Sequence, residues 1–187
     1  MTREALLEAL SSTLSKSNVQ ELAALAGDEK LPIPDLLDIS FWKDAPTIAF
    51  RSAWVLEHAA LSYPDCFLYY FPEFVQRLHE QQNSSCQRCF TKILMHLTSP
   101  KAPIACREAL ASIADQENIV EVIFDWLIKP ETPVAVRVNC LDILLNFSYT
   151  FPWIKEELQA QTEFYLQDGS PAMLARGKKI LRQVTKV

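Results

Sequence analysis

Two cysteines separated by two residues, Cys86 and Cys89, have a spacing that is typical of metal or redox sites. Structural zinc takes four ligands, and the sequence holds no second pair of this kind. His79 precedes the pair, and His96 follows Cys89 by seven residues, a separation that can place both on one helical face. Metal binding and thiol chemistry stay open as alternatives, but the interpretation we favour is small, buried, apolar thiols. We therefore expect no metal and no cofactor.

Residues for other catalysis are missing from the sequence. The three histidines, His58, His79 and His96, lack the Ser/Asp or Cys/Asn context that would build a proton relay. Nucleophile elbows, P-loops and dinucleotide fingerprints are absent. We expect no catalytic residue, and we predict that the protein is not an enzyme. An enzyme built around Cys86, Cys89 and His96 would require a bound metal.

The composition favours an all-helical chain. The 187 residues fit one domain, residues 1–187, with an apolar share of 49% and only three glycines for hairpin turns. Most of the eleven prolines stand where helices should begin or end. Apolar spacing predicts about 9–11 helices, within residues 3–14, 19–26, 35–43, 45–62, 72–82, 84–97, 104–114, 119–128, 134–149, 153–166 and 171–184.

Two of these segments need comment. Residues 45–62 are apolar on nearly every face, which indicates a helix in the middle of a stack. Residues 134–138 alternate like a strand, but the apolar pattern continues to Phe147, too far for a typical strand. We therefore predict a helix there.

A short motif recurs along the chain: a proline, a few small or apolar residues, then an arginine that opens an apolar run. An offset of 86 aligns two of its copies and equals two periods of 43, within the range of about 40 to 47 for paired-helix repeats. The copies are Pro46 to Arg51, Pro103 to Arg107, Pro133 to Arg137 and Pro171 to Arg176.

These motifs resemble HEAT repeats, the helix-pair units of the HEAT/armadillo class. The resemblance implies an α-α superhelix, a right-handed solenoid of antiparallel helix pairs with a concave surface. In that family, acids before the arginines form a ladder between repeats, since a carboxylate satisfies a half-buried guanidinium. The implied structural pairs are Asp44 with Arg51, Glu131 with Arg137, and Asp168 with Arg176.

The repetition is irregular in the middle of the chain. Arg107 has no acid at the matching position, so we expect an irregular repeat near residues 98–118. Residues 171–187 hold five cations and no acid, which predicts a basic C-terminal capping helix or a surface for an acidic partner.

The net charge and the cysteines indicate which partners and which cellular compartment to expect. The net charge of −5 argues against nucleic-acid binding as a default. The N-terminus does not read as a secretory signal, and no apolar run is long enough to span a membrane. An odd number of cysteines, five, fits reduced thiols. We predict a cytoplasmic protein without membrane contact.

The sequence thus predicts a non-enzymatic scaffold or adaptor that binds another protein, as a monomer or weak homodimer. The alternative is nucleic-acid binding through an arginine-lined concave surface, as in alkylation-repair glycosylases built from HEAT-like units. Aromatic and arginine side chains dominate interface energetics. The expected partner-binding residues are Arg51, Trp54, His58, Arg137, Arg176 and Lys179.

Overall fold

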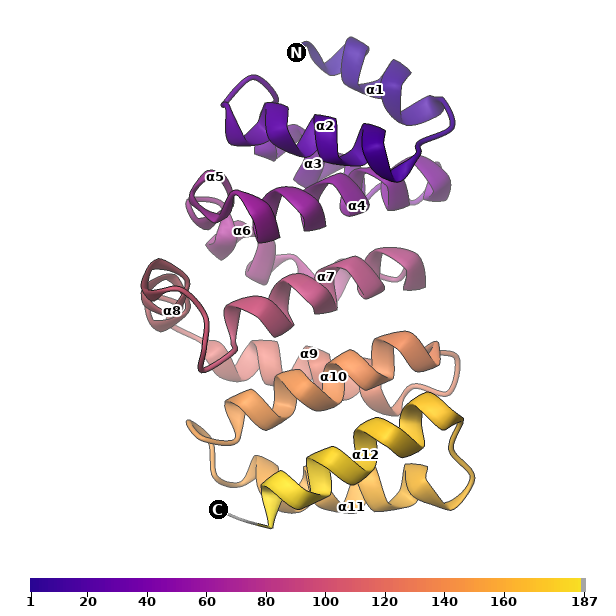
Figure 1. Ribbon diagram of the computed structural model, residues 1–187, viewed down its shortest axis with the longest axis vertical. Coiled ribbons are helices and arrows are strands. Elements are labelled where there is room, and N and C mark those ends of the chain that lie inside the picture. Colours follow the sequence, from indigo (N-terminus) through magenta and orange to yellow (C-terminus); the bar gives the residue numbers. More distant parts are fainter. Residues whose placement is uncertain (186–187) are drawn as a thin grey trace.

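The computed structural model describes residues 1–185, and within that range the chain forms helices and no strand. The segment 134–147 is a helix, as predicted. Figure 1 shows the helices stacked along one axis with the two termini at opposite ends, so the predicted all-α solenoid is confirmed. The elements are α1 (Arg3–Ser11), α2 (Lys16–Gly27), α3 (Ile33–Ser40), α4 (Pro46–Ser62), α5 (Pro64–Leu68), α6 (Phe71–Gln76), the 3₁₀ turn η1 (Leu78–Glu80), α7 (Ser84–Leu97), α8 (Ile104–Ala111), α9 (Gln116–Ile128), α10 (Val134–Phe147), α11 (Ile154–Gln167) and α12 (Pro171–Val184).

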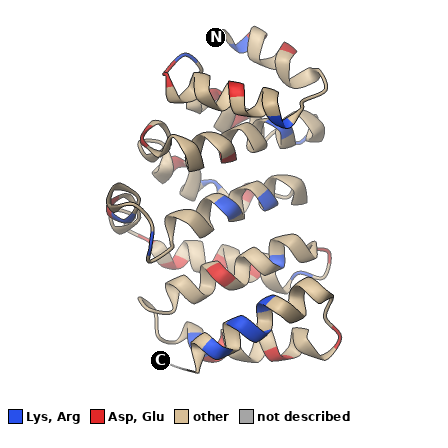
Figure 2. Ribbon diagram, viewed as in Figure 1, with Lys and Arg blue, Asp and Glu red and all other residues tan. Residues whose placement is uncertain are grey.

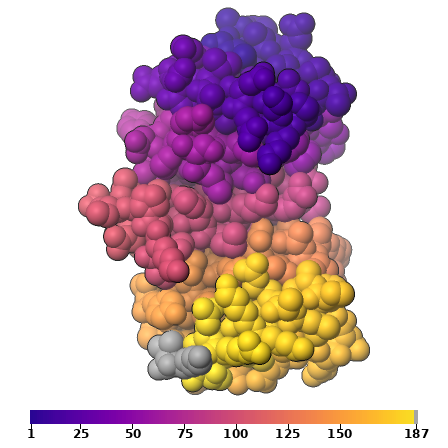
Figure 3. Space-filling view, in the orientation of Figure 1, coloured from indigo at the N-terminus to yellow at the C-terminus, as the bar shows by residue number. Residues whose placement is uncertain are grey.

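The stack has two layers. Helices α2, α4, α7, α10 and α12 follow one another in the nearer layer of Figure 1, each packed on the next. The fainter helices behind them include α3, α9 and α11, which pack on α4, α10 and α12. We call the nearer layer the front layer. Each of its helices contacts its neighbours in the row, and α4, α10 and α12 also contact a helix of the layer behind. The space-filling view shows the resulting elongated body (Figure 3).

The prolines of the recurring motif start helices, as predicted. Pro46 and Pro171 are the first residues of α4 and α12, where a missing N–H leaves no hydrogen bond unmade. Pro103 and Pro133 occupy the N-cap positions of α8 and α10. The motif therefore marks the start of three front-layer helices and of α8.

One continuous apolar core runs through both layers. Within it the fully buried rings of Phe67, Phe74 and Phe90 meet. The ring centroid of Phe74 lies 5.4 Å from that of Phe67 and 4.8 Å from that of Phe90. Two of these rings come from the short helices α5 and α6, in a segment where the sequence predicted only a connection and one helix. Burial of these rings also takes the backbone next to them out of water. The backbone N–H and C=O groups then need hydrogen-bond partners nearby, and short helices supply them.

Helix α8 departs from the two-layer arrangement. Figure 1 shows it nearly end-on at the edge of the stack, and its contacts include α5 and α7. Only Cys106 of this helix is buried, while Ile104 is 65% exposed. Residues 104–111 lie within the segment for which the sequence predicted an irregular repeat.

Candidate functional site

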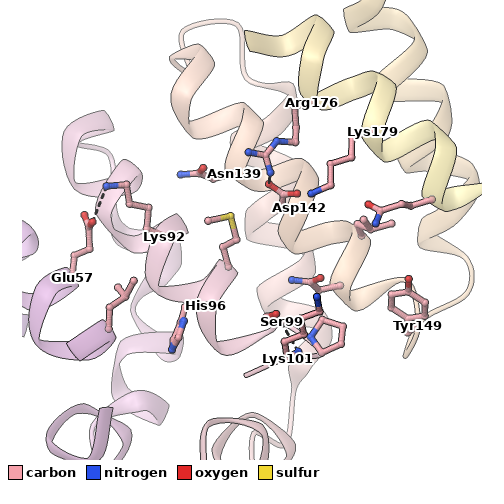
Figure 4. A pocket seen from close by; sticks show the side chains of 16 residues that line it. Glu57, Lys92, His96, Ser99, Lys101, Asn139, Asp142, Tyr149, Arg176 and Lys179 are labelled. Atoms are coloured by element: carbon pink, nitrogen blue, oxygen red, sulfur yellow. Dashed lines mark hydrogen bonds and ion pairs between the residues drawn. The ribbon is translucent and has the colours of Figure 1, made fainter. Parts of the chain in front are cut away.

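A groove of about 700 Å³ crosses the exposed side of α4, α7, α10 and α12 (Figure 4). Its side chains recur at helical spacing, so that one face of each of these four helices contributes. The α10 contribution is Asn139, Asp142, Leu145, Asn146 and, just beyond the helix, Tyr149. The α12 contribution is Arg176, Lys179 and Gln183. Helix α4 adds Glu57 and Leu61, and α7 with the following loop adds Lys92, Met95, His96, Ser99, Pro100 and Lys101.

Ion pairs join neighbouring helices across this groove. Lys92 of α7 donates to Glu57 of α4 at 2.7 Å, and Arg176 of α12 donates to Asp142 of α10. Both carboxylates are nearly buried, with 6% and 8% of their residue surfaces exposed. A carboxylate that has lost its water needs a cation or a hydrogen-bond donor, so each pair fixes the position of its cation.

Side-chain amides bridge α7 and α10 in the same way. Asn139 donates to the hydroxyl of Thr91 and Asn146 to that of Thr98, each at 3.0 Å. The two asparagines are seven residues apart, as are the two threonines, which is two helical turns on both helices. Each bond uses one amide proton, so the amide carbonyls of both asparagines are left as acceptors at the groove.

An aromatic strip continues the site along α4. The rings of Phe50 and Trp54 stack at 6.0 Å, and His58 meets Trp54 edge-on at 6.3 Å. The guanidinium of Arg88 lies 5.8 Å from the centre of the Phe50 ring. The predicted residues Trp54 and His58 are half-buried and adjoin Glu57, which lines the groove. The strip therefore extends the groove face toward the N-terminal half.

Two of the predicted partner-binding arginines bind backbone carbonyls. Arg51 donates to the carbonyls of Leu10 and Ser11 at 2.8 and 3.0 Å, at the end of α1. Arg137 donates to the carbonyls of Lys129 and Pro130 at 2.9 and 2.8 Å, just beyond α9. The last carbonyls of a helix have no partner within it and carry partial negative charge, so a guanidinium satisfies them well.

These contacts correct the predicted acid–arginine pairs. Within residues 1–185 no ion pair joins Asp44 to Arg51 or Glu131 to Arg137, and both acids are exposed. Backbone carbonyls at or just beyond the helix ends take the place of these carboxylates. For a solvated carboxylate, pairing would gain little over its hydration.

The third pair is corrected in a different way. Arg176 bonds Asp142 of the preceding front-layer helix, 34 residues earlier, while Asp168 is exposed before α12. The pairing follows from the row of front-layer helices, in which α12 packs directly on α10. A signal was present in the sequence, since Asp142 is the one carboxylate of α10 and stands between the apolar residues Leu141 and Ile143.

The Cys86 and Cys89 pair lies in the core. Cys86 and Cys89 are fully buried, and burial raises the pKa of the Cys86 thiol to about 12 and that of Cys89 also upward. Protonated thiols are poor nucleophiles and poor ligands. His79 is exposed on η1, whereas His96 lines the groove, so the structure separates the two histidines. Among residues 1–185 no cluster of three or more His, Cys, Asp or Glu could hold a metal ion.

Lysine and arginine are most concentrated on α7 and α12 of the front layer, with an acidic residue of α10 between them and one of α4 on the other side of α7 (Figure 2). Sequence reasoning found Arg176 and Lys179 of this set but missed several groove residues. The missed residues are Glu57, Lys92, His96, Lys101, Asn139, Asp142 and Asn146. Their helical spacing was visible, but nothing in the sequence alone indicated which face of α7 and α10 stays uncovered.

Comparison with known protein families gives a match over most of the chain. A family model described as a HEAT repeat domain matches residues 6–184. No curated protein and no solved structure matches the chain. In the described range, 1–185, no helix is both long and apolar enough to span a membrane.

Proposed function

The chain belongs to the HEAT repeat domain family, and we propose that it is a non-enzymatic scaffold that binds another protein in the groove across α4, α7, α10 and α12. The observation that carries the proposal is the groove itself. Four consecutive front-layer helices present polar, charged and apolar side chains to one open surface. A mixture of this kind suits the core and rim of a protein interface.

The groove is preorganised for binding. The Glu57–Lys92 and Asp142–Arg176 pairs and the two asparagine–threonine bonds hold side chains in place before any partner arrives. Side chains that are already ordered lose less conformational entropy when a complex forms. We assign Trp54, His58 and Lys179 to partner contact, and Arg176, which holds Asp142, to the support of the groove.

For Arg51 and Arg137 we propose a supporting role. Their guanidinium groups already hold the ends of α1 and α9. The odd number of cysteines, all of them unpaired, favours the cytoplasm as the place where the scaffold works.

We do not propose nucleic-acid binding. That alternative required a free arginine seam, whereas Arg51, Arg137 and Arg176 donate to carbonyls or to a buried carboxylate. The chain as a whole also carries a net charge of −5, which repels a phosphate backbone.

Photo-crosslinking tests the proposal. A photoreactive phenylalanine analogue replaces Leu61, which lines the groove and is 39% exposed, in the protein expressed in its own cells. The control carries the analogue at Glu121, exposed on α9 in the other layer. We expect a discrete protein adduct from position 61 and none from position 121. The same adducts from both positions, or adducts from 121 alone, would contradict the placement of the partner.

A further inference from the structure

We infer that the groove takes an acidic, extended segment of its partner protein, in which carboxylates flank a large apolar side chain. This inference rests on the proposed function and specifies the chemistry of the partner.

The charge of the groove differs in sign from that of the chain. Four cations and two carboxylates line it, a net charge of +2 with histidine neutral, whereas the whole chain carries −5. The cations are Lys92, Lys101, Arg176 and Lys179. An acidic segment is therefore attracted to this surface and repelled by most of the remainder.

Two of the cations are available to a partner. Lys92 and Arg176 hold Glu57 and Asp142, but Lys101 and Lys179 have no carboxylate partner within residues 1–185. Figure 4 shows Lys101 in the loop after α7 and Lys179 on α12, on two different sides of the groove. Because both side chains are exposed, they can reach carboxylates that lie apart along one segment.

A basic segment fits less well. The groove carboxylates Glu57 and Asp142 are buried and already paired, so an incoming cation would have to displace Lys92 or Arg176. The second carboxylate oxygen of Glu57 has no hydrogen-bond partner but is covered, so it is closed to a ligand. Displacement would leave a desolvated cation or carboxylate uncompensated.

The apolar part of the segment follows from the side chains between these charges. Leu61, Met95 and Leu145 line the groove from α4, α7 and α10. Burying a large apolar side chain against them removes both surfaces from water, and the flexible methionine adapts to its shape. The free amide oxygens of Asn139 and Asn146 can accept backbone N–H groups of an extended chain.

A protein segment fits this pattern better than a nucleic acid. A nucleic acid presents a negative charge at every nucleotide and binds best to a continuous row of cations. Here Asp142 and Glu57 interrupt the row, and only two cations are uncompensated in the described part of the groove. A segment with a few separated carboxylates matches two separated lysines.

A phage-displayed library of random linear peptides tests the inference on the full chain. We expect the selected peptides to be enriched in Asp and Glu around a Leu, Phe or Trp. Fluorescent synthetic copies of the selected peptides are then titrated with the parent chain and with the Lys101→Glu/Lys179→Glu variant, and the two dissociation constants are compared. We expect binding about tenfold to 100-fold weaker, since two exposed attractions become repulsions.

The matched control is Lys178→Glu/Arg182→Glu, which makes the same change in net charge. Both residues are exposed on α12 and lie outside the groove lining. We expect its affinity to stay within about threefold of the parent chain. An equal loss in both double variants would refute the inference, because attraction would then depend on total charge and not on the groove.

A third variant separates the inference from the proposed function. Met95→Arg blocks the groove, and circular dichroism checks that each variant keeps its helical content. If the selected peptides lack acidic enrichment and Met95→Arg abolishes their binding, the acidic inference is refuted, but the proposal of a protein-binding groove is supported. Absence of any binder, or binders indifferent to Met95→Arg, would count against both. A single-stranded DNA oligonucleotide is the last probe. If it binds the parent chain more tightly than the selected peptides do, and the Lys101→Glu/Lys179→Glu variant loses that binding, the inference is refuted and the groove is assigned to nucleic acid.

Discussion

Replacing Asp142 with asparagine removes the charge that holds Arg176 and so tests the pair that joins α10 to α12. The side chain of Asp142 is 11% exposed and that of Arg176 is 34% exposed, so the carboxylate is mostly withdrawn from water while the guanidinium is partly solvated. A hydrogen bond to a charged group contributes about 1.5–3 kcal/mol, and partial exposure of the arginine lowers that figure. We expect Asp142→Asn to reduce the free energy of unfolding by about 1–3 kcal/mol.

A double-mutant cycle isolates the pair. Urea unfolding is measured for Asp142→Asn, Arg176→Met and the double variant, and we expect a coupling energy of about 1–2 kcal/mol. A second cycle uses Asp168→Asn with Arg176→Met, the pair implied by sequence spacing. Because Asp168 is exposed and forms no ion pair with Arg176, we expect coupling of less than about 0.5 kcal/mol. A larger coupling for Asp168 than for Asp142 would refute the assignment of the pair.

The remaining predictions concern helix ends, the core and the thiols. Arg51→Met should lower the free energy of unfolding by about 1–3 kcal/mol, because two carbonyls at the end of α1 lose their donor, while Arg107→Met on the exposed face of α8 should change it by less than about 0.5 kcal/mol. Phe74→Ala should cost about 3–5 kcal/mol in the same urea assay, since the ring is fully buried among aromatic neighbours. A thiol reagent should modify native Cys66, which is half-buried, before Cys86, and mass spectrometry of tryptic peptides reports the order. Stability should fall as the pH rises above the ordinary thiol pKa of 9.0, because folded Cys86, with its pKa at about 12, keeps a proton that the unfolded chain releases. The free energy of unfolding should fall by up to about 1.4 kcal/mol per pH unit through this thiol. Thermal melts of the parent and of Cys86→Ala between pH 8 and 11 compare the two pH dependences, and equal dependences would contradict this assignment.

The sequence predicted the repeating helices well because their signals are local. A proline in the first turn, an apolar stripe and a short polar connection act within one helix, as at Pro46 and Pro171. The segment around Phe67 was harder, since its short helices depend on the packing of Phe67 on Phe74, and of Phe74 on Phe90 of α7, and not on their own periodicity.

The partners of Arg51 and Arg176 depend on the fold and not on sequence spacing. Arg51 contacts carbonyls about 40 residues earlier, and Arg176 a carboxylate 34 residues earlier. Both distances follow from which helices are neighbours, whereas the predicted acids stood six to eight residues away. The groove escaped prediction for the same reason, because Lys92 and Asn139 become part of one surface only when α7 and α10 lie side by side.

The bonds that cross the groove each tie one front-layer helix to the next. In a stack whose units contact only their neighbours, the ends can unfold separately from the middle. A bound segment that touches α4 and α12 together introduces a long-range tether that the free protein lacks. A partner bound in the groove should therefore slow the hydrogen exchange of backbone amides in α4 and in α12 alike. The rigidity of the stack then reports whether a partner is bound.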